Sequence, residues 1–211
     1  MIKKKRANEI FRRLARRYPD PEPALDWSHA WELLVATVLA AQCTDERVNK
    51  VTPALFKRWP TIADMATADI HEVEEMVRST GFFRNKAKNI VASASLIINE
   101  FGGRVPETMA ELIRLPGVAR KTANIVLSNA FHIHEGIAVD THVKRLSFRL
   151  GLTKHTDPVR IEKDLMPLFE RKNWGDINHF LVYYGREVCN AQRPRCTECE
   201  LADICPKKGV E

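Results

Sequence analysis

The sequence predicts an all-α protein, and two observations carry this prediction. Apolar residues recur at helical spacing along nearly the whole 211-residue chain, and no segment shows the strict alternation that is typical of a strand. Turn-forming Pro and Gly residues separate these segments, so the helices are expected to be short and numerous. Because 45% of the residues are hydrophobic and neither repeats nor low-complexity stretches occur, the sequence favours a compact globular protein.

The expected helices follow from the apolar residues in chain order. They are marked by Ile10 and Leu14; by Leu33, Leu34, Val38 and Leu39; by Val73, Met76 and Val77; by Ile90, Ala94, Ile97 and Ile98; and by Ile125 and Val126. The breaks fall at Pro19 to Pro23, Trp59-Pro60, Gly102-Gly103 and Leu115-Pro116-Gly117. The connector 131–136 lies between two strongly apolar segments and is the best candidate for a domain boundary.

The charge balance favours a polyanionic partner without identifying it. Thirty-three Lys and Arg residues against 27 Asp and Glu residues give a net charge of +6 and a pI near 9.1. No apolar stretch is long enough to cross a bilayer, and residues 1–6 lead into an amphipathic segment and not into an uninterrupted apolar signal core. We therefore expect a cytoplasmic protein without a membrane partner, with a monomer as the default.

The densest motif is residues 111–123, where a short helical run meets Pro116-Gly117 and a second helix begins at once. This pattern predicts a helix-hairpin-helix. The unpaired N–H groups at the start of the second helix suit a phosphate oxygen and need no particular base. An ordinary Pro-Gly connector between packed helices remains an equally open interpretation of the residues alone.

Two residues near this motif have complementary chemistry. Lys121 lies in the first turn of the second helix, where the helix dipole opposes positive charge and favours the neutral, nucleophilic amine. An exposed lysine that faces phosphate is the alternative that the residues alone favour. Asp140 precedes a helical segment and is expected to be its N-cap, which leaves an ionised carboxylate available for proton transfer. We expect His142 to be a structural histidine and not a catalyst.

Four of the five cysteines form the C-terminal pattern C-x6-C-x2-C-x5-C, namely Cys189, Cys196, Cys199 and Cys205. In a reducing compartment such clustering indicates a metal site, and four thiolates suit an iron–sulfur cluster or zinc. Only the second and third cysteines form a close pair, which favours a cluster. Arg193 and Arg195 lie between the first two cysteines and are available to phosphates.

Together, the segment 115–124, the segment 139–142 and the cysteine spacing closely resemble the endonuclease III family, in the iron–sulfur branch of the helix-hairpin-helix DNA glycosylase superfamily. The resemblance covers essentially the whole chain, and it extends to the segments 39–45 and 80–87.

The resemblance implies a bifunctional DNA glycosylase and AP lyase of base excision repair. Lys121 would attack C1′ of an oxidised pyrimidine nucleoside such as thymine glycol, forming a Schiff base that permits β-elimination. Asp140 would assist departure of the base and later proton transfers, and the four cysteines would hold a 4Fe-4S cluster. The partner would be double-stranded DNA with damaged pyrimidines or abasic sites, so the protein would associate with the nucleoid when bound.

The resemblance also implies several DNA contacts. Gln42 would fill the space that the flipped nucleotide leaves, and Phe82 would wedge the opposite strand. On the residues alone these two are a helix-end glutamine and a core aromatic. The remaining expected contacts are Gly117, Ala119, Thr122 and His142. Two departures from the family pattern are Ala119, where glycine is commonest, and Phe82-Phe83, where leucine and tyrosine are usual.

The family architecture implies two helical domains flanking a DNA-binding cleft. A six-helix domain would span residues 22–133, and residues 1–21 with 134–211 would form the iron–sulfur domain. Lys121 and Asp140 would then lie on opposite sides of the cleft.

Three alternatives remain. A pyrimidine-dimer glycosylase and AP lyase of the same subfamily uses the same chemistry. A mismatch adenine glycosylase typically lacks the lysine and carries an extra C-terminal domain, whereas this chain has Lys121 and ends soon after Cys205. A non-catalytic DNA-binding or redox module would need only the hairpin and the cluster.

Overall fold

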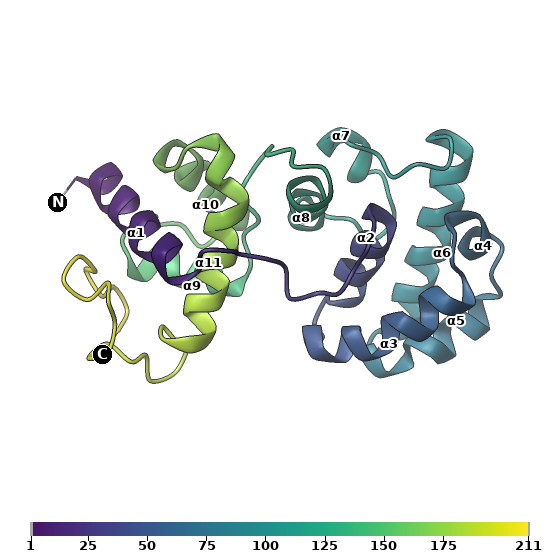
Figure 1. Ribbon diagram of the computed structural model, residues 1–211, viewed down its shortest axis with the longest axis horizontal. Coiled ribbons are helices and arrows are strands. Elements are labelled where there is room, and N and C mark those ends of the chain that lie inside the picture. The colour runs from purple at the N-terminus through teal and green to yellow at the C-terminus, as the bar shows by residue number, and fades with distance from the viewer. Residues whose placement is uncertain (1, 211) are drawn as a thin grey trace. The chain divides into compact units, whose positions relative to one another are not determined.

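The computed structural model describes residues 2–210, and within them it contains helices and loops but no β-strand, which confirms the all-α prediction (Figure 1). The α-helices are α1 (Lys3–Arg17), α2 (Ala30–Leu39), α3 (Asp45–Arg58), α4 (Ile62–Ala66), α5 (Ile70–Val77), α6 (Phe83–Glu100), α7 (Met109–Leu112), α8 (Arg120–Ala130), α9 (Thr141–Arg149), α10 (Pro158–Leu165) and α11 (Trp174–Glu187). Three short 3-10 helices are η1 (Arg78–Thr80), η2 (Met166–Leu168) and η3 (Arg171–Asn173). No helix of the described chain combines the length and hydrophobicity that crossing a bilayer requires.

The chain divides into two compact units, each with its own core. The hairpin unit is Pro23–Ile133, and the cysteine unit is Met1–Glu22 together with His134–Glu211. The hairpin unit, all of which the structure describes, has seven α-helices where six were expected, and α4 and α7 are short segments of five and four residues. Thr61 and Thr108 cap these two short helices by accepting backbone N–H groups, so each has a stable start despite its length.

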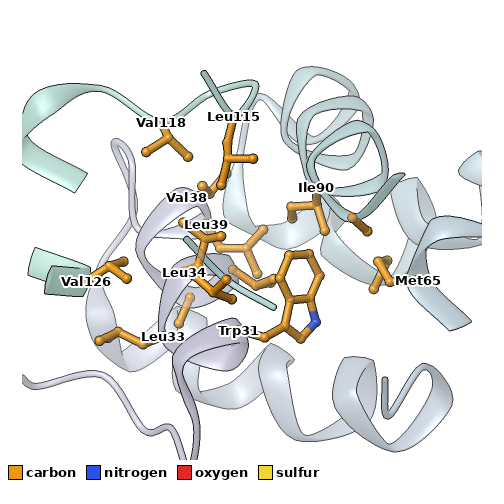
Figure 2. Close-up of a cluster of buried hydrophobic side chains, with 14 of the residues drawn as sticks. Trp31, Leu33, Leu34, Val38, Leu39, Met65, Ile90, Leu115, Val118 and Val126 are labelled. Atoms are coloured by element: carbon orange, nitrogen blue, oxygen red, sulfur yellow. The ribbon is translucent and has the colours of Figure 1, made fainter. Parts of the chain in front are cut away.

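Helix α2 is the centre of the hairpin unit. Its residues 33–39 are all buried, and the one polar side chain among them, Thr37, donates to the Leu33 carbonyl, so other helices can cover α2 on every side. It packs against α3, α6 and α8. Leu115 and Val118, which flank the Pro116-Gly117 turn, lie in the same buried cluster as Val38 (Figure 2). The hydrophobic core therefore fixes the position of the hairpin.

The cysteine unit is built on the packing of α9 against α11. Gly185 of α11 lies at this contact, where a Cβ atom would approach His142 Nδ1 to 2.8 Å. Only glycine allows so close an approach of the two helices at this point. Ile10 and Leu14 of α1 complete the core, and after α11 the described chain continues to residue 210 without a further helix (Figure 1).

Candidate functional site

The turn between α7 and α8 confirms the predicted helix-hairpin-helix. Gly117 has a φ of 77°, in the left-handed region that favours glycine. A Cβ atom there would also lie 2.6 Å from Asn89 Nδ2 on α6. Ser93 of α6 donates a hydrogen bond to the Pro116 carbonyl at 3.1 Å. Helix α6 therefore holds this turn through the Ser93 hydrogen bond and lies against it at Asn89, and the sequence motif alone gave no sign of either residue.

The start of α8 has the geometry of an anion site. Its first main-chain hydrogen bond runs from the Ala123 N–H to the Ala119 carbonyl, so the N–H groups of the first three helical residues lie ahead of it. Ala119 is the N-cap and supplies no side-chain acceptor. Its φ of −90° and ψ of 168° suit any residue, so alanine replaces glycine here without backbone strain.

Lys121 and Thr122 lie in this first turn but differ in exposure. The Lys121 side chain is exposed, as a nucleophile that must reach a sugar requires. Thr122 is only 8% exposed, so its side chain faces the core. The group of Thr122 that could contact a phosphate is therefore its backbone N–H, while its buried side chain helps to pack the first turn of α8.

Asp140 is the N-cap of α9, as the sequence predicted. Its carboxylate accepts a hydrogen bond from the Val143 N–H at 2.7 Å, and the residue is half-buried. The preceding extended segment is held by Asn178 of α11, which donates to the Ala138 carbonyl at 2.7 Å. The carboxylate is therefore fixed by its own helix while the backbone before it is fixed by another.

Helix α9 links Asp140 to the cysteine loop. One turn after the cap, Arg145 donates to the Gly185 carbonyl at 2.8 Å and to the Cys189 carbonyl at 3.1 Å. Arg145 also lies 3.1 Å from His142 Nδ1. Burial lowers the pKa of His142, and nearby arginines act in the same direction although Asp140 opposes them. His142 is thus neutral at physiological pH and is part of the contact with α11.

The four cysteines of the C-terminal pattern, Cys189, Cys196, Cys199 and Cys205, are all half-buried and line one hollow. No disulfide joins them. Among the described residues, no three His, Cys, Asp or Glu side chains converge closely enough to hold a single metal ion. Burial raises the pKa of the Cys205 thiol, so its thiolate requires a compensating positive charge.

Hydrogen-bond donors lie close to three of the four cysteine sulfurs. The Tyr184 hydroxyl lies 3.1 Å from Cys199 Sγ, and the Lys207 N–H lies 3.3 Å from Cys205 Sγ. Arg149 is buried and lies 3.4 Å from Cys189 Sγ. Donors placed in this way stabilise thiolates, so the donor set fits a metal group held by four cysteines.

Arg149 also determines the path of the loop that follows Cys189. Its guanidinium donates to the Asn190 carbonyl at 2.6 Å and to the Ala191 carbonyl at 2.9 Å. Further along this loop, Arg193 and Arg195 are both exposed, and Arg195 pairs only loosely with Glu198 at 4.0 Å. The two cations are therefore available to an anionic partner.

Gln42 and Phe82 are both exposed and both strained. Their φ angles are 54° and 48°, in a region that residues with a Cβ atom rarely adopt. Phe82 is 64% exposed, so the interpretation as a core aromatic is wrong. Such strain persists where surrounding structure imposes it, and it concentrates at functional sites.

Sequence reasoning missed Arg145 and Arg149, which link α9 to the cysteine loop. A signal was present, because the two arginines are four residues apart and therefore share one face of the helix that begins after Asp140. It also missed Lys86, a buried lysine of α6.

Comparison with known proteins gives a consistent result. Residues 35–171 match the HhH-GPD superfamily of base excision DNA repair proteins. The chain is 57% identical to an endonuclease III of Synechocystis sp. over 97% of this chain and 93% of that protein. It is 44% identical to an endonuclease III of Bacillus subtilis over 92% of this chain and 91% of that protein.

Solved structures give the same result. The structure of a trapped covalent intermediate between endonuclease III and DNA has a TM-score of 0.92 and 41% identity, covering 98% of this chain and 97% of that chain. A thermostable thymine-DNA glycosylase, only 20% identical, shares the fold with a TM-score of 0.86.

Proposed function

The chain belongs to the endonuclease III family of the HhH-GPD superfamily, and from this premise we propose that Lys121 and Asp140 carry out its reaction. The protein is a DNA glycosylase and AP lyase of base excision repair. Its substrate is double-stranded DNA. We place the protein in the cytoplasm, associated with the nucleoid when it is bound to DNA. The observation that carries the assignment of roles is the exposed amine of Lys121 in the uncapped first turn of α8.

The hairpin binds the DNA backbone next to the lesion. The N–H groups at the start of α8 donate to a phosphate, and Gly117 allows the strand to approach closely. These contacts read no base, so they position any duplex equally well. Lys121 follows the turn directly and is therefore delivered to the sugar of a bound strand.

Lys121 is the nucleophile. Its neutral amine attacks C1′, the bond from C1′ to the base breaks, and the base leaves with a proton. Loss of the amine proton and opening of the sugar ring give a Schiff base between Nζ and C1′. Removal of a proton from C2′ then expels the 3′ phosphate by β-elimination, which breaks the strand.

Asp140 handles protons and charge. As a carboxylate it stabilises the positive charge that develops on the sugar while the base departs. It then accepts and returns protons in the ring-opening steps. The hydrogen bond from the Val143 N–H holds one carboxylate oxygen and leaves the other for this work.

Gln42 and Phe82 stabilise the flipped state. Flipping a nucleotide costs a few kcal/mol of stacking and pairing, which damage reduces. The exposed Phe82 ring is suited to insertion between bases, and Gln42 can hydrogen-bond to groups that lose their pairing partner.

The four cysteines hold a 4Fe-4S cluster, which makes the loop carrying Arg193 and Arg195 rigid. The support is the four-thiol donor set, which lines one hollow, and the hydrogen-bond donors near the sulfurs. Within this loop the two arginines contact phosphates.

Borohydride trapping tests the proposal. Wild type, Lys121→Ala and the exposed-lysine control Lys163→Ala are incubated with duplexes that carry one thymine glycol, one cyclobutane dimer or one abasic site. We expect wild type and control to be trapped on the thymine glycol and abasic duplexes, and Lys121→Ala on neither.

Each other result points to a specific revision. Trapping of Lys121→Ala at the wild-type level would remove the lysine from its role. Trapping on the dimer instead of thymine glycol would assign the protein to the pyrimidine-dimer glycosylases. Binding without any trapping would favour a non-catalytic module.

A further inference from the structure

Lys86 of α6 is buried where a lysine is costly. It is 5% exposed and lies in the first turn of its helix, where the helix dipole opposes a cation. Burial lowers its pKa. Two hydrogen bonds offset these costs, because Nζ donates to the Leu39 carbonyl at 2.8 Å and to the Thr80 carbonyl at 2.7 Å.

These two carbonyls belong to different loops. Leu39 is the last residue of α2, three residues before Gln42. Thr80 is the last residue of η1, two residues before Phe82. The backbone N–H of Lys86 also donates to the Phe82 carbonyl at 3.1 Å. One residue is therefore bonded at three points to the two loops that carry the strained tips.

The side chains at the tips cannot hold the loops themselves. Gln42 and Phe82 are exposed, and their left-handed backbone conformations require support from the structure around them. That support comes from the residues at the base of each loop. Lys86 joins the two bases, and the ammonium group, a compact charge with rotatable donors, is suited to reach carbonyls in two segments.

We propose that Lys86 is a positioning residue that fixes the Gln42 loop against the Phe82 loop, so that both side chains enter the duplex at the same step. This inference rests on the proposed insertion of Gln42 and Phe82 into DNA. Lys86 itself does not touch the substrate. Its effect is therefore confined to steps that require a nucleotide to leave a duplex.

The test compares Lys86→Met with Lys88→Met, which changes an exposed lysine of the same helix. Two activities are measured: excision of thymine glycol from a duplex, and strand cleavage at an abasic site in single-stranded DNA. Fluorescence of 2-aminopurine beside the lesion reports the opening of the stack.

For Lys86→Met we expect kcat/KM for duplex excision to fall about tenfold or more, because small misplacements of positioning groups are expensive. The 2-aminopurine signal should fall with it. Cleavage of the single strand should stay within about twofold of wild type, since it needs no insertion into a stack. Lys88→Met should match wild type in all three measurements. An equal loss on both substrates would overturn the proposal.

A double-mutant cycle separates positioning from general destabilisation. In a background of Gln42→Ala and Phe82→Ala, the change Lys86→Met should add little further loss of duplex excision. If it adds its full effect there, Lys86 does not act through these residues and the inference is wrong.

If Gln42 and Phe82 do not insert into the duplex at all, the experiment gives a different result from a failure of the Lys86 inference. In that case the Gln42→Ala, Phe82→Ala background alone would excise from the duplex as wild type does. Should Lys86→Met fail to fold, Lys86→Gln takes its place, because its shorter amide cannot reach both carbonyls. It is expected to show the same selective loss on duplex DNA, and an equal loss on both substrates would again overturn the proposal.

Discussion

At the scale of the single residue, Asp140 has a structural role and a proposed catalytic role. The structure shows the structural role directly, because the carboxylate caps α9. The second needs an ionised oxygen, which the cap does not consume. The two roles can be separated because asparagine caps a helix nearly as well as aspartate but cannot accept a proton at neutral pH.

We predict that Asp140→Asn lowers kcat for base excision by about 10²-fold or more while the melting temperature stays close to wild type. Asp140→Ala should lose the activity and also about 1 kcal/mol of stability. The matched control is Asp157→Ala, which removes the equivalent cap of α10 and should cost similar stability with full activity. Excision kinetics and urea unfolding measure both effects, and full activity of Asp140→Asn would contradict the assignment.

His179 of α11 makes the fold sensitive to acid. Burial lowers its pKa to about 4 in the folded protein, whereas the unfolded value is near 6.5. The unfolded chain therefore binds the proton first as pH falls. The contribution of His179 to stability is complete above pH 6.5 and is lost as pH falls toward 4.

The expected loss is up to about 3 kcal/mol of unfolding free energy across this window. Urea unfolding at pH 7 and pH 5 should show a smaller pH dependence for His179→Gln than for wild type. His71→Gln, which changes an exposed histidine, should keep the wild-type dependence. Equal pH dependence in all three proteins would show that His179 is not responsible.

The residues differ in how far the sequence predicted them. Asp140 and Lys121 were placed correctly on their helices, because capping and helix starts are local properties. Phe82 could not be placed by its hydrophobicity, since its exposure depends on the left-handed backbone that begins at Gly81. Lys86 and Arg149 were missed because a buried cation is identified only by the carbonyls that other segments bring to it.

At the scale of the element, the hairpin turn requires glycine for two separate reasons. Gly117 has a positive φ, and a Cβ atom there would collide with Asn89. Gly102 also has a positive φ, of 59°, but a Cβ atom there would meet nothing within 4 Å. The pair therefore separates backbone strain from steric collision.

Gly117→Ala should destabilise the protein by more than Gly102→Ala, for which we expect about 1–2 kcal/mol. Adding Asn89→Ala to Gly117→Ala should recover the part of the loss that the collision causes. DNA affinity should fall for Gly117→Ala and stay unchanged for Gly102→Ala. Urea unfolding and fluorescence anisotropy with a duplex measure these effects, and equal losses at the two glycines would rule out the collision.

The contact between α9 and the cysteine loop is the second element on which function depends. Removing the Arg149 guanidinium leaves the carbonyls of Asn190 and Ala191 without their donor. Arg149→Met should therefore loosen the loop, lower the iron content of the purified protein and speed proteolysis near residues 190–195. A loss of about 1.5–3 kcal/mol is expected for hydrogen bonds to a charged group.

The control for this prediction is Arg160→Met, which changes an exposed arginine of α10 and should retain iron as wild type does. If Arg149→Met has the iron content and the proteolysis rate of wild type, the cysteines alone determine the conformation of the loop.

At the scale of the whole molecule, the chain forms two units, each with its own hydrophobic core. Of the two proposed catalytic residues, Lys121 belongs to the hairpin unit and Asp140 to the cysteine unit. The sequence predicted the helical class because periodicity is visible along the chain. It did not mark α4, whose five residues are too few to show a period. The hollow lined by the cysteines depends on how distant segments pack, so spacing predicted its ligands but not the donors around them.

The central claim is that the amine of Lys121 bonds covalently to C1′ of the damaged nucleotide. The most direct test reduces the complex of the wild-type protein with a thymine glycol duplex, digests it and locates the modified residue by mass spectrometry. We predict that the sugar remnant is found on Nζ of Lys121 and on no other amine. A remnant on a different lysine or on the N-terminal amine would contradict the account.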